Sequence, residues 1–228
     1  MRIKVINPNT TASMTATIGA VARSVASSST EIIACNPTTG PAAIEGHYDE
    51  AMSVVGVLEE IRKGEAEDID GYVIACFGDP GLLAARELAK GPVLGIAEAA
   101  MHTASFVATG FSLVTTLART KVIAQHLVEC YGMTRFCRKI RAIDLPVLSL
   151  ETDQARTALL QACQLAMKED GCGAIVLGCG GMADLSRELS QDLGIPVIDG
   201  VSAAVKLIEA LLSLGLGTSK VGDLDYPT

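Results

Sequence analysis

Two cysteines occupy comparable places in two apolar segments. Cys76 follows the apolar run in GYVIACFGDPG, residues 71–81, and Cys179 follows the run in GAIVLGCGGM, residues 173–182. Each thiol comes after a segment typical of a buried parallel strand and before a predicted helix. A thiol at a helix N-terminus feels the positive end of the helix dipole, which lowers its pKa. The sequence therefore predicts two reactive thiols, each at the end of a strand.

Two thiols that face one another can transfer protons at a carbon atom. One thiolate removes a proton from one face and the other thiol returns a proton to the opposite face, which inverts the configuration. The reaction needs no metal and no organic cofactor if N–H donors stabilise the enolate. We expect such donors around Asp79 and Pro80, the predicted N-cap and first residue of a helix. Gly180 and Gly181 allow a similarly close approach of backbone to a ligand.

The elements that position the thiols alternate between strand and helix, which is typical of parallel sheets covered by helices on both faces. The predicted strands cover residues 3–7, 31–35, 71–76, 93–96, 111–115, 139–143, 174–177 and 196–199. The predicted helices cover residues 12–25, 48–63, 80–89, 120–131, 154–168, 182–193 and 202–214. The fold class is therefore α/β.

The second half of the chain repeats the first. IKVINPNTT corresponds to FSLVTTLART, GYVIACFG to GAIVLGCG, and GPVLGIAEAA to GIPVIDGVSAA, in the same order and at similar spacing. Within this repeat we take Asn9 as the counterpart of Thr115, because each precedes its cysteine by a similar number of residues. Ligands bind at the carboxyl ends of strands in open α/β sheets, so two facing halves bring both thiols to one cleft. We predict two similar lobes, each a short parallel sheet flanked by helices, with the active site between them.

Composition and charge argue against several classes of protein. The 228 residues are 49% apolar and only 4% aromatic, which suits an Ala, Val, Leu and Ile core. A net charge of −8 without a basic stripe argues against a nucleic-acid or membrane partner. The sequence has no apolar stretch of transmembrane length and no signal-peptide pattern, so we expect a cytoplasmic protein. Seven cysteines without a CxxC pair, and three scattered histidines, favour neither a disulfide framework nor a metal site.

The chain resembles the aspartate/glutamate/hydantoin racemase superfamily, and within it the hydantoin racemase group. The matching stretches run in order along nearly the whole chain: INPNTT, GPAAIEGHYDEA, YVIACFGDPGL, GIAEAAMH, EDGCGAIVLGCGGM, PVIDGVSAA and LGLGTSK. The resemblance implies that Cys76 and Cys179 are the acid/base pair. It also implies that the substrate oxygens are bound at Asn9, Phe77, Gly78, Thr115, Thr116, Gly180 and Gly181.

The same resemblance carries expectations about domains, partners and substrate. The family's chain closes back onto the first lobe, which would then comprise residues 1–98 and about 206–228, with residues 99–205 forming the second lobe. A homo-oligomer is implied. EGHYDEAMSVVGVLEEIR and GDPGLLAARELAKGP are most similar to members of bacterial purine catabolism that act on allantoin. The implied small-molecule substrate is therefore a 5-substituted hydantoin, with allantoin first. Phe77-Gly78 replace part of the CNTA motif of amino-acid racemases, which disfavours free aspartate or glutamate.

Several alternatives stay open at this point. Glu45 either accepts hydrogen bonds from a substrate N–H or is only a helix-entry residue. Asn9 either donates to a ring carbonyl or forms a local Asx turn. A racemase of 5-alkyl or 5-aryl hydantoins would share the same motifs. A thiol redox protein would need Cys76 and Cys179 at disulfide distance, and a small-molecule binding module would tolerate the loss of either thiol.

Overall fold

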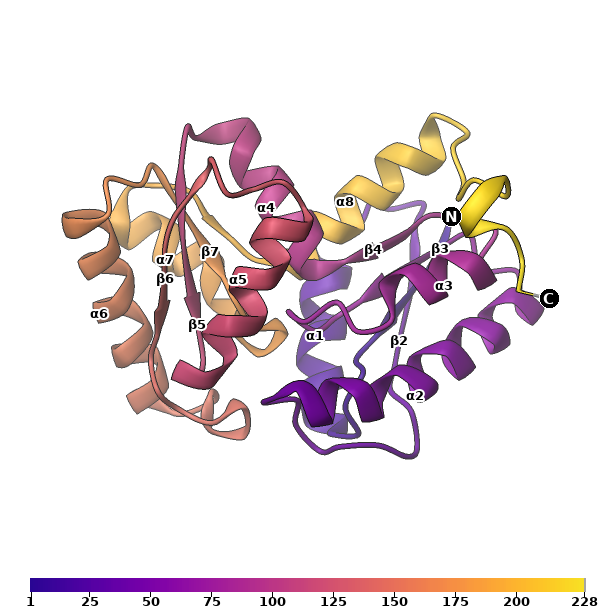
Figure 1. The fold of residues 1–228 in the computed structure, drawn as a ribbon, viewed down its shortest axis with the longest axis horizontal. Helices are drawn as coiled ribbons and strands as arrows, with labels where there is room; N and C mark the ends of the chain where they lie inside the picture. The colour runs from indigo at the N-terminus through magenta and orange to yellow at the C-terminus, as the bar shows by residue number, and fades with distance from the viewer. Residues whose placement is uncertain (228) are drawn as a thin grey trace.

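Two four-stranded sheets lie side by side in the computed structural model, which describes residues 1–227 (Figure 1). The first sheet contains β1 (Arg2–Ile6), β2 (Glu31–Cys35), β3 (Gly71–Ile74) and β4 (Val93–Gly95), in the order β2-β1-β3-β4. The second contains β5 (Phe111–Thr115), β6 (Cys137–Ala142), β7 (Ala174–Leu177) and β8 (Val197–Ile198), in the order β6-β5-β7-β8. All neighbouring strands are parallel. The predicted pair of similar α/β lobes is confirmed.

Helices cover both sheets. They are α1 (Ala12–Val25), α2 (His47–Ala66), α3 (Leu82–Leu88), α4 (Ile96–Val107), α5 (Lys121–Cys130), α6 (Asp153–Glu169), α7 (Ser186–Leu193) and α8 (Gly200–Ser213). Short 3₁₀ helices are η1 (Ala118–Thr120), η2 (Val147–Ser149), η3 (Gly180–Leu185) and η4 (Gly222–Leu224). Each predicted strand and helix has a counterpart with slightly different bounds. Helix α4 was not predicted, because β4 passes into it at Gly95 with no intervening loop to mark a boundary.

The first sheet buries both faces, as expected of parallel strands. Ile3 and Val5 point to one face and share a cluster with apolar residues of α1 and α8. Tyr72 and Ile74 point to the other face and pack with residues of α2 and α3. The alternation follows from the two-residue repeat of a strand, so one strand serves two helical layers.

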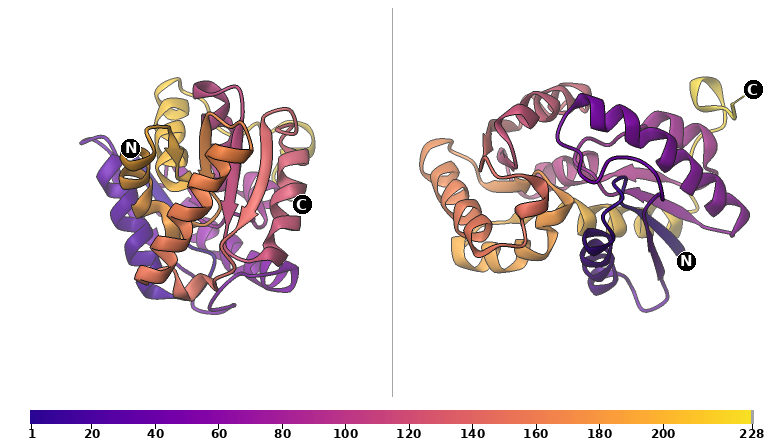
Figure 2. Two further views of the ribbon diagram at one scale, coloured as in Figure 1. Left: turned by 90° about the vertical axis from the view of Figure 1, so that its left-hand side faces the viewer. Right: turned by 90° about the horizontal axis from the view of Figure 1, so that it is seen from below.

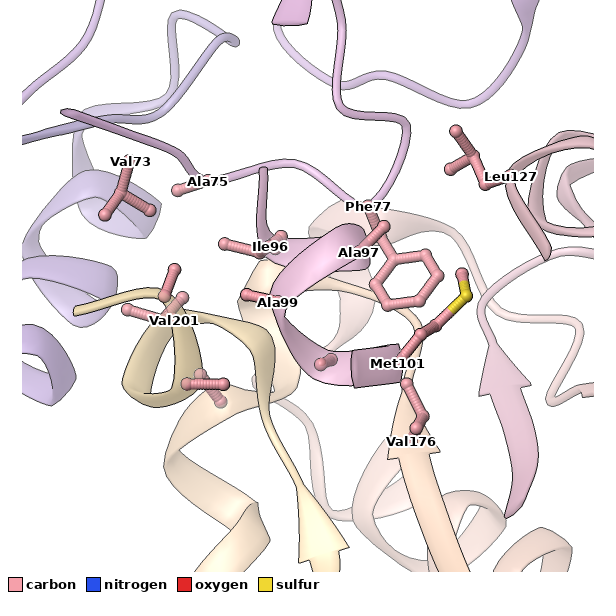
Figure 3. Packing of buried hydrophobic residues seen from close by; sticks show 14 of the residues in the cluster. Val73, Ala75, Phe77, Ile96, Ala97, Ala99, Met101, Leu127, Val176 and Val201 are labelled. Atoms are coloured by element: carbon pink, nitrogen blue, oxygen red, sulfur yellow. The ribbon is translucent and has the colours of Figure 1, made fainter. Parts of the chain in front are cut away.

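The two lobes share one hydrophobic core. The cluster under α1 and α8 continues through α4 to Phe111, Leu113 and Val176 of the second sheet. Figure 3 shows the ring of Phe77 beside Ala97 and Met101 of α4, with Val176 beyond. Burial of this shared apolar surface opposes separation of the lobes.

The chain returns to the first lobe at its last helix. Helix α8 packs on α1, α4 and strands β3 and β4 of the first sheet, and Figures 1 and 2 show it in yellow beside that sheet. The approach is close: a Cβ at Gly71 would lie 2.7 Å from Ile208 of α8. The predicted division into 1–98 with about 206–228, and 99–205, stays a prediction. Within residues 1–227, no helix is both long and apolar enough to cross a membrane.

Candidate active site

A cavity opens where the two lobes meet at the ends of β3 and β7. It is lined by residues of the strand ends, of α1, α2 and α5, and of the segments that follow the strands. These residues are Asn7, Asn9, Met14, Ile44, Glu50, Ala75, Cys76, Phe77, Gly78, Thr115, Thr116, Thr120, Ile123, Ala124, Val147, Gly178, Cys179 and Gly180. Apolar side chains from both lobes and a small number of polar groups are the usual composition of a small-molecule site.

Eight of the ten predicted site residues line this cavity: Asn9, Cys76, Phe77, Gly78, Thr115, Thr116, Cys179 and Gly180. The other two, Glu45 and Gly181, do not. Gly181 lies just behind one thiol, since a Cβ built on it would stand 3.8 Å from Sγ of Cys179. The fold therefore gathers the predicted positions from two lobes around one space.

The two thiols occupy equivalent positions in their lobes. Ala75, just before Cys76, donates its N–H to the carbonyl of Ile6 at 2.8 Å. Gly178, just before Cys179, donates in the same way to Val114 at 2.8 Å. Each thiol thus comes one residue after the last hydrogen bond between the two central strands of its sheet. The predicted equivalence of Cys76 and Cys179 agrees with this register.

The same register corrects the predicted match between Asn9 and Thr115. Ile6 pairs with Ile74 and Val114 pairs with Leu177, so the residue equivalent to Thr115 is Asn7. The sequence comparison therefore paired Thr115 with a residue two positions too far along the chain. Asn7 lines the cavity and was missed by sequence reasoning.

Burial governs the titration of the thiols. It raises the pKa of Cys76 well above the usual range, and the N–H of Gly78 offsets only part of this effect. It raises the pKa of Cys179 to about 11, against a lowering contribution from the N–H of Gly181. The predicted lowering by helix dipoles is therefore wrong. The physical reason is that desolvation by burial outweighs the nearby N–H donors. In addition, no α-helix starts directly at either thiol, since α3 starts at Leu82 and η3, a 3₁₀ helix, follows Cys179.

Asp79 does not cap the helix that follows it, in contrast to the prediction. Helix α3 is preceded by Gly81 in the left-handed region, at φ 71°, with no side-chain cap. The Asp79 carboxylate instead accepts hydrogen bonds from the N–H groups of Ala97 and Glu98, in the first turn of α4. Asp79 therefore satisfies N–H groups in the first turn of α4, a helix that the sequence pattern did not indicate and whose own N-cap residue is Gly95.

Asn9 forms the local turn that the sequence left open as one of its two roles, and donation to a substrate carbonyl stays a prediction. Its Oδ1 accepts hydrogen bonds from the N–H of Thr11 and from the Asn7 amide, both at 2.9 Å, which is the Asx-turn arrangement. Its Nδ2 has only the thioether sulfur of Met14 at 3.3 Å, a weak acceptor. The turn therefore fixes the Asn9 side chain and leaves its donor directed at the cavity wall.

The second lobe contributes hydroxyl groups. Thr115 Oγ1 lies 2.9 Å from Thr120 Oγ1, at the start of α5. Thr115 and Thr116 are both buried, although each lines the cavity. Phe77 behaves differently, because its ring packs in the shared core (Figure 3). At Phe77 the backbone, and not the ring, is therefore the part suited to contact a ligand.

Glu45 joins the lobes. Its Oε1 accepts a hydrogen bond of 2.7 Å from the N–H of Val147, at the start of η2. Its backbone N–H is in turn held by Asp49 Oδ2 at 3.0 Å. One carboxylate oxygen of Glu45 is thus committed to the second lobe, and a role in binding substrate stays a prediction.

Glu50 is the carboxylate that lines the cavity, and sequence reasoning missed it. A Cβ at Gly78 would lie 3.5 Å from the carboxyl carbon of Glu50. The imidazole of His47 lies nearby, with 3.8 Å between its Nδ1 and Glu50 Oε2. Burial raises the pKa of Glu50, and the two histidines His47 and His126 oppose that rise. The signal was its position one helical turn after His47 in GHYDEA, which turns the two side chains to one side of α2.

Metal ligation has no support in the described part of the chain. Residues 1–227 contain no group of three or more His, Cys, Asp or Glu side chains placed to hold a metal ion. The seven cysteines are all free thiols. The chemistry available in the cavity is thus that of two thiols, one carboxylate, amides, hydroxyls and backbone N–H groups.

Comparison with known proteins identifies relatives along the full length. The profile of the family described as Asp/Glu/Hydantoin racemase matches residues 3–208. A curated protein named hydantoin racemase, from Rhizobium meliloti, is 56% identical over 100% of this chain and 95% of its own length.

Two solved structures have both high identity and the same fold. One is described as allantoin racemase from Klebsiella pneumoniae, with 61% identity, a TM-score of 0.99, and coverage of 100% of this chain and 94% of that chain. The other is an allantoin racemase from Pseudomonas fluorescens, with 40% identity, a TM-score of 0.94, and coverage of 100% and 97%.

Proposed function

Because the chain belongs to the Asp/Glu/hydantoin racemase family, we propose that it inverts C5 of 5-substituted hydantoins, with allantoin as the first substrate. The protein is a racemase, as its relatives at high identity are. The proposal adds the substrate and the mechanism, in which Cys76 and Cys179 act as the two bases. The observation that carries it is that equivalent thiols of the two lobes line one cavity.

The reaction needs one thiolate and one thiol. The thiolate takes the C5 proton, and the electron pair left on C5 delocalises into the adjacent ring carbonyl as an enolate. The opposite thiol then gives its proton to the other face of C5, so the two sulfurs exchange protonation states in each turnover. C5 is acidic because of this delocalisation, which makes a thiolate an adequate base.

Backbone N–H groups are proposed to hold the ring oxygens. Phe77 and Gly78 lie beside one thiol, and Gly180 and Gly181 beside the other. Donors fixed in advance stabilise the negative charge that develops on an enolate oxygen and need no reorganisation. The N–H groups that lower the thiol pKa values, those of Gly78 and Gly181, would also favour the thiolate form needed for proton removal.

Allantoin is supported by the polar part of the lining and by the names of the two similar structures. The C5 substituent of allantoin is a ureido group, which offers several N–H donors, and Glu50 is an acceptor in the cavity wall. A second candidate is a racemase of 5-alkyl or 5-aryl hydantoins. It is favoured by the apolar residues Met14, Ile123 and Val147 on the same wall. The cytoplasmic location, the part in purine catabolism and the homo-oligomer stay predictions.

The test follows one enantiomer of allantoin in D₂O, by optical rotation and by deuterium at C5, with a 5-alkyl hydantoin in parallel. Wild type should lose rotation and incorporate deuterium. Cys76→Ser and Cys179→Ser should each abolish racemisation, and each should keep exchange with a different enantiomer. If only the 5-alkyl hydantoin is racemised, the substrate is a 5-alkyl hydantoin and not allantoin. Racemisation at the wild-type rate by either serine variant would contradict the two-thiol mechanism.

A further inference from the structure

Asp79 stands three residues after Cys76, in a backbone conformation unusual for a side-chain-bearing residue. Its φ is 46°, in the left-handed region, which Asp and Asn tolerate better than other residues. Its N–H donates to the carbonyl of Cys76 at 3.0 Å. The residue therefore closes a tight turn that starts at the thiol-bearing residue itself.

The carboxylate of Asp79 is buried and fully engaged. Oδ1 accepts from the N–H of Ala97 at 3.0 Å, and Oδ2 from the N–H of Glu98 at 2.9 Å. Oδ2 also accepts the hydroxyl of Tyr131 at 2.7 Å. Tyr131 directly follows α5 of the second lobe. One side chain thus ties the turn at Cys76 to the N-terminus of α4 and to the opposite lobe.

The residues around the Asp79 carboxylate pack closely against it. A Cβ on Gly95 would fall 2.0 Å from Cγ of Asp79, so only glycine there admits the carboxylate. Glu98 is neutralised by Arg86, with 2.5 Å between Nη2 and Oε2. His102 contacts the Glu98 carbonyl through Nδ1 at 2.9 Å and lies beside the Tyr131 ring. The arrangement is built around an acceptor at Asp79.

We infer that Asp79 is a positioning residue that fixes Cys76 against the second lobe, an inference that rests on the proposed two-thiol mechanism. Its hydrogen bonds define where the turn that begins at Cys76 lies relative to both lobes. No equivalent tie is made by the residue three positions after Cys179, which is Met182, an apolar side chain. Loss of the Asp79 acceptor should therefore displace one thiol and leave the other in place.

Displacement of Cys76 should affect the two enantiomers differently, whereas general destabilisation of the protein should affect both equally. In D₂O, Cys179 would still remove and return a proton at C5 of the enantiomer that it faces. Exchange with the other enantiomer, and racemisation of both, need Cys76 in position. A misplacement of about 1 Å can cost on the order of 100-fold in rate. We expect Asp79→Asn to lower racemisation at least about tenfold and to give one-sided exchange, matching Cys76→Ser in the enantiomer affected.

The experiment compares C5 exchange of both enantiomers in Asp79→Asn, Tyr131→Phe, Cys76→Ser and Cys179→Ser. Tyr131→Phe removes one of the three hydrogen bonds and should give a weaker form of the same asymmetry, so it carries the test if Asp79→Asn does not fold. Asp68→Asn is the matched control, because Asp68 is also left-handed, at φ 53°, but is exposed and away from the cavity.

Equal loss of exchange with both enantiomers, in whichever Asp79 or Tyr131 variant folds, would overturn the positioning role. Loss of exchange with the enantiomer that Cys179→Ser affects, instead of the one that Cys76→Ser affects, would overturn the positioning role as well. If the two serine variants themselves fail to show opposite one-sided exchange, the two-thiol mechanism is what fails, and the role of Asp79 falls with it.

Discussion

Gly180 of the second lobe lies directly against the backbone carbonyl of Ala75 in the first. A Cβ built on Gly180 would stand 2.8 Å from that oxygen. Each of these residues is the immediate chain neighbour of a cavity thiol, Cys179 and Cys76 respectively. A close approach between the lobes thus occurs beside the two sulfurs, and the distance between the thiols depends on the absence of a side chain at residue 180.

Gly180→Ala should therefore impair racemisation more than folding. The added methyl must push the two thiol-bearing segments apart, at a cost of about 1–3 kcal/mol in the free energy of unfolding. A shift of about 1 Å should lower kcat/KM on the order of 100-fold. The control is Gly217→Ala, whose Cβ would lie 2.7 Å from the carbonyl of Lys90, an equally tight contact outside the cavity. Equal loss of activity in both variants would contradict this explanation.

Glu50→Gln should weaken substrate binding and alter the pH profile. The carboxylate would accept N–H groups of allantoin, and a hydrogen bond to a charged group contributes about 1.5–3 kcal/mol. We expect KM for allantoin to rise about tenfold, with kcat less affected. Because the charge of Glu50 also contributes to raising the pKa of Cys76, the kcat/KM profile should move to lower pH. Glu59→Gln, an exposed change on the same helix, is the control, and an unchanged KM in Glu50→Gln would exclude the binding role.

Racemisation should accelerate as the pH rises from neutral. Burial raises the pKa of Cys76, and that of Cys179 to about 11, so most of both thiols is protonated at pH 7. Each added pH unit should then raise the thiolate fraction, and kcat/KM with it, about tenfold until the lower apparent pKa of the pair is reached. The profile should be measured from pH 6.5 to 9.5, with the uncatalysed alkaline racemisation subtracted. A flat profile over this range would mean that the resting site already holds a thiolate.

Glu209→Gln should destabilise the fold at neutral pH and much less in acid. Burial acts to raise the pKa of Glu209, but hydrogen bonds from Lys206 and Ser27 outweigh it and hold the pKa at about 2. A depressed pKa adds stability that is complete above the unfolded-state value near 4.5 and is lost as the pH falls towards 2. We expect the variant to lose about 2–3 kcal/mol at pH 7.

Urea unfolding at pH 7 and at pH 3 tests this dependence for Glu209→Gln. The difference in the free energy of unfolding between variant and wild type should be smaller at pH 3 than at pH 7. Glu129→Gln, on the exposed side of α5, should show no comparable gap at either pH. A gap that is constant with pH would indicate that Glu209 stabilises by shape and neutral hydrogen bonding, not by its charge.

The sequence by itself predicted the repeated strand-helix pattern, the two parallel lobes and the pair of thiols. These features depend on local periodicity and on motifs repeated along the chain, such as GYVIACFG and GAIVLGCG, which any single sequence displays. It also indicated most of the cavity wall, because residues that follow parallel strands must meet at one edge of a sheet.

Only the tertiary structure decided what each of those residues contacts. The carboxylate of Asp79 caps α4 and binds Tyr131, 52 positions away in the chain, and local pattern contains no information about such partners. The thiol pKa values rise because burial outweighs nearby N–H donors, and burial is a property of the assembled lobes. Glu50 of α2 reaches the cavity, while Glu45, just before that helix, binds Val147 of the second lobe, and both contacts exist only once the lobes are assembled.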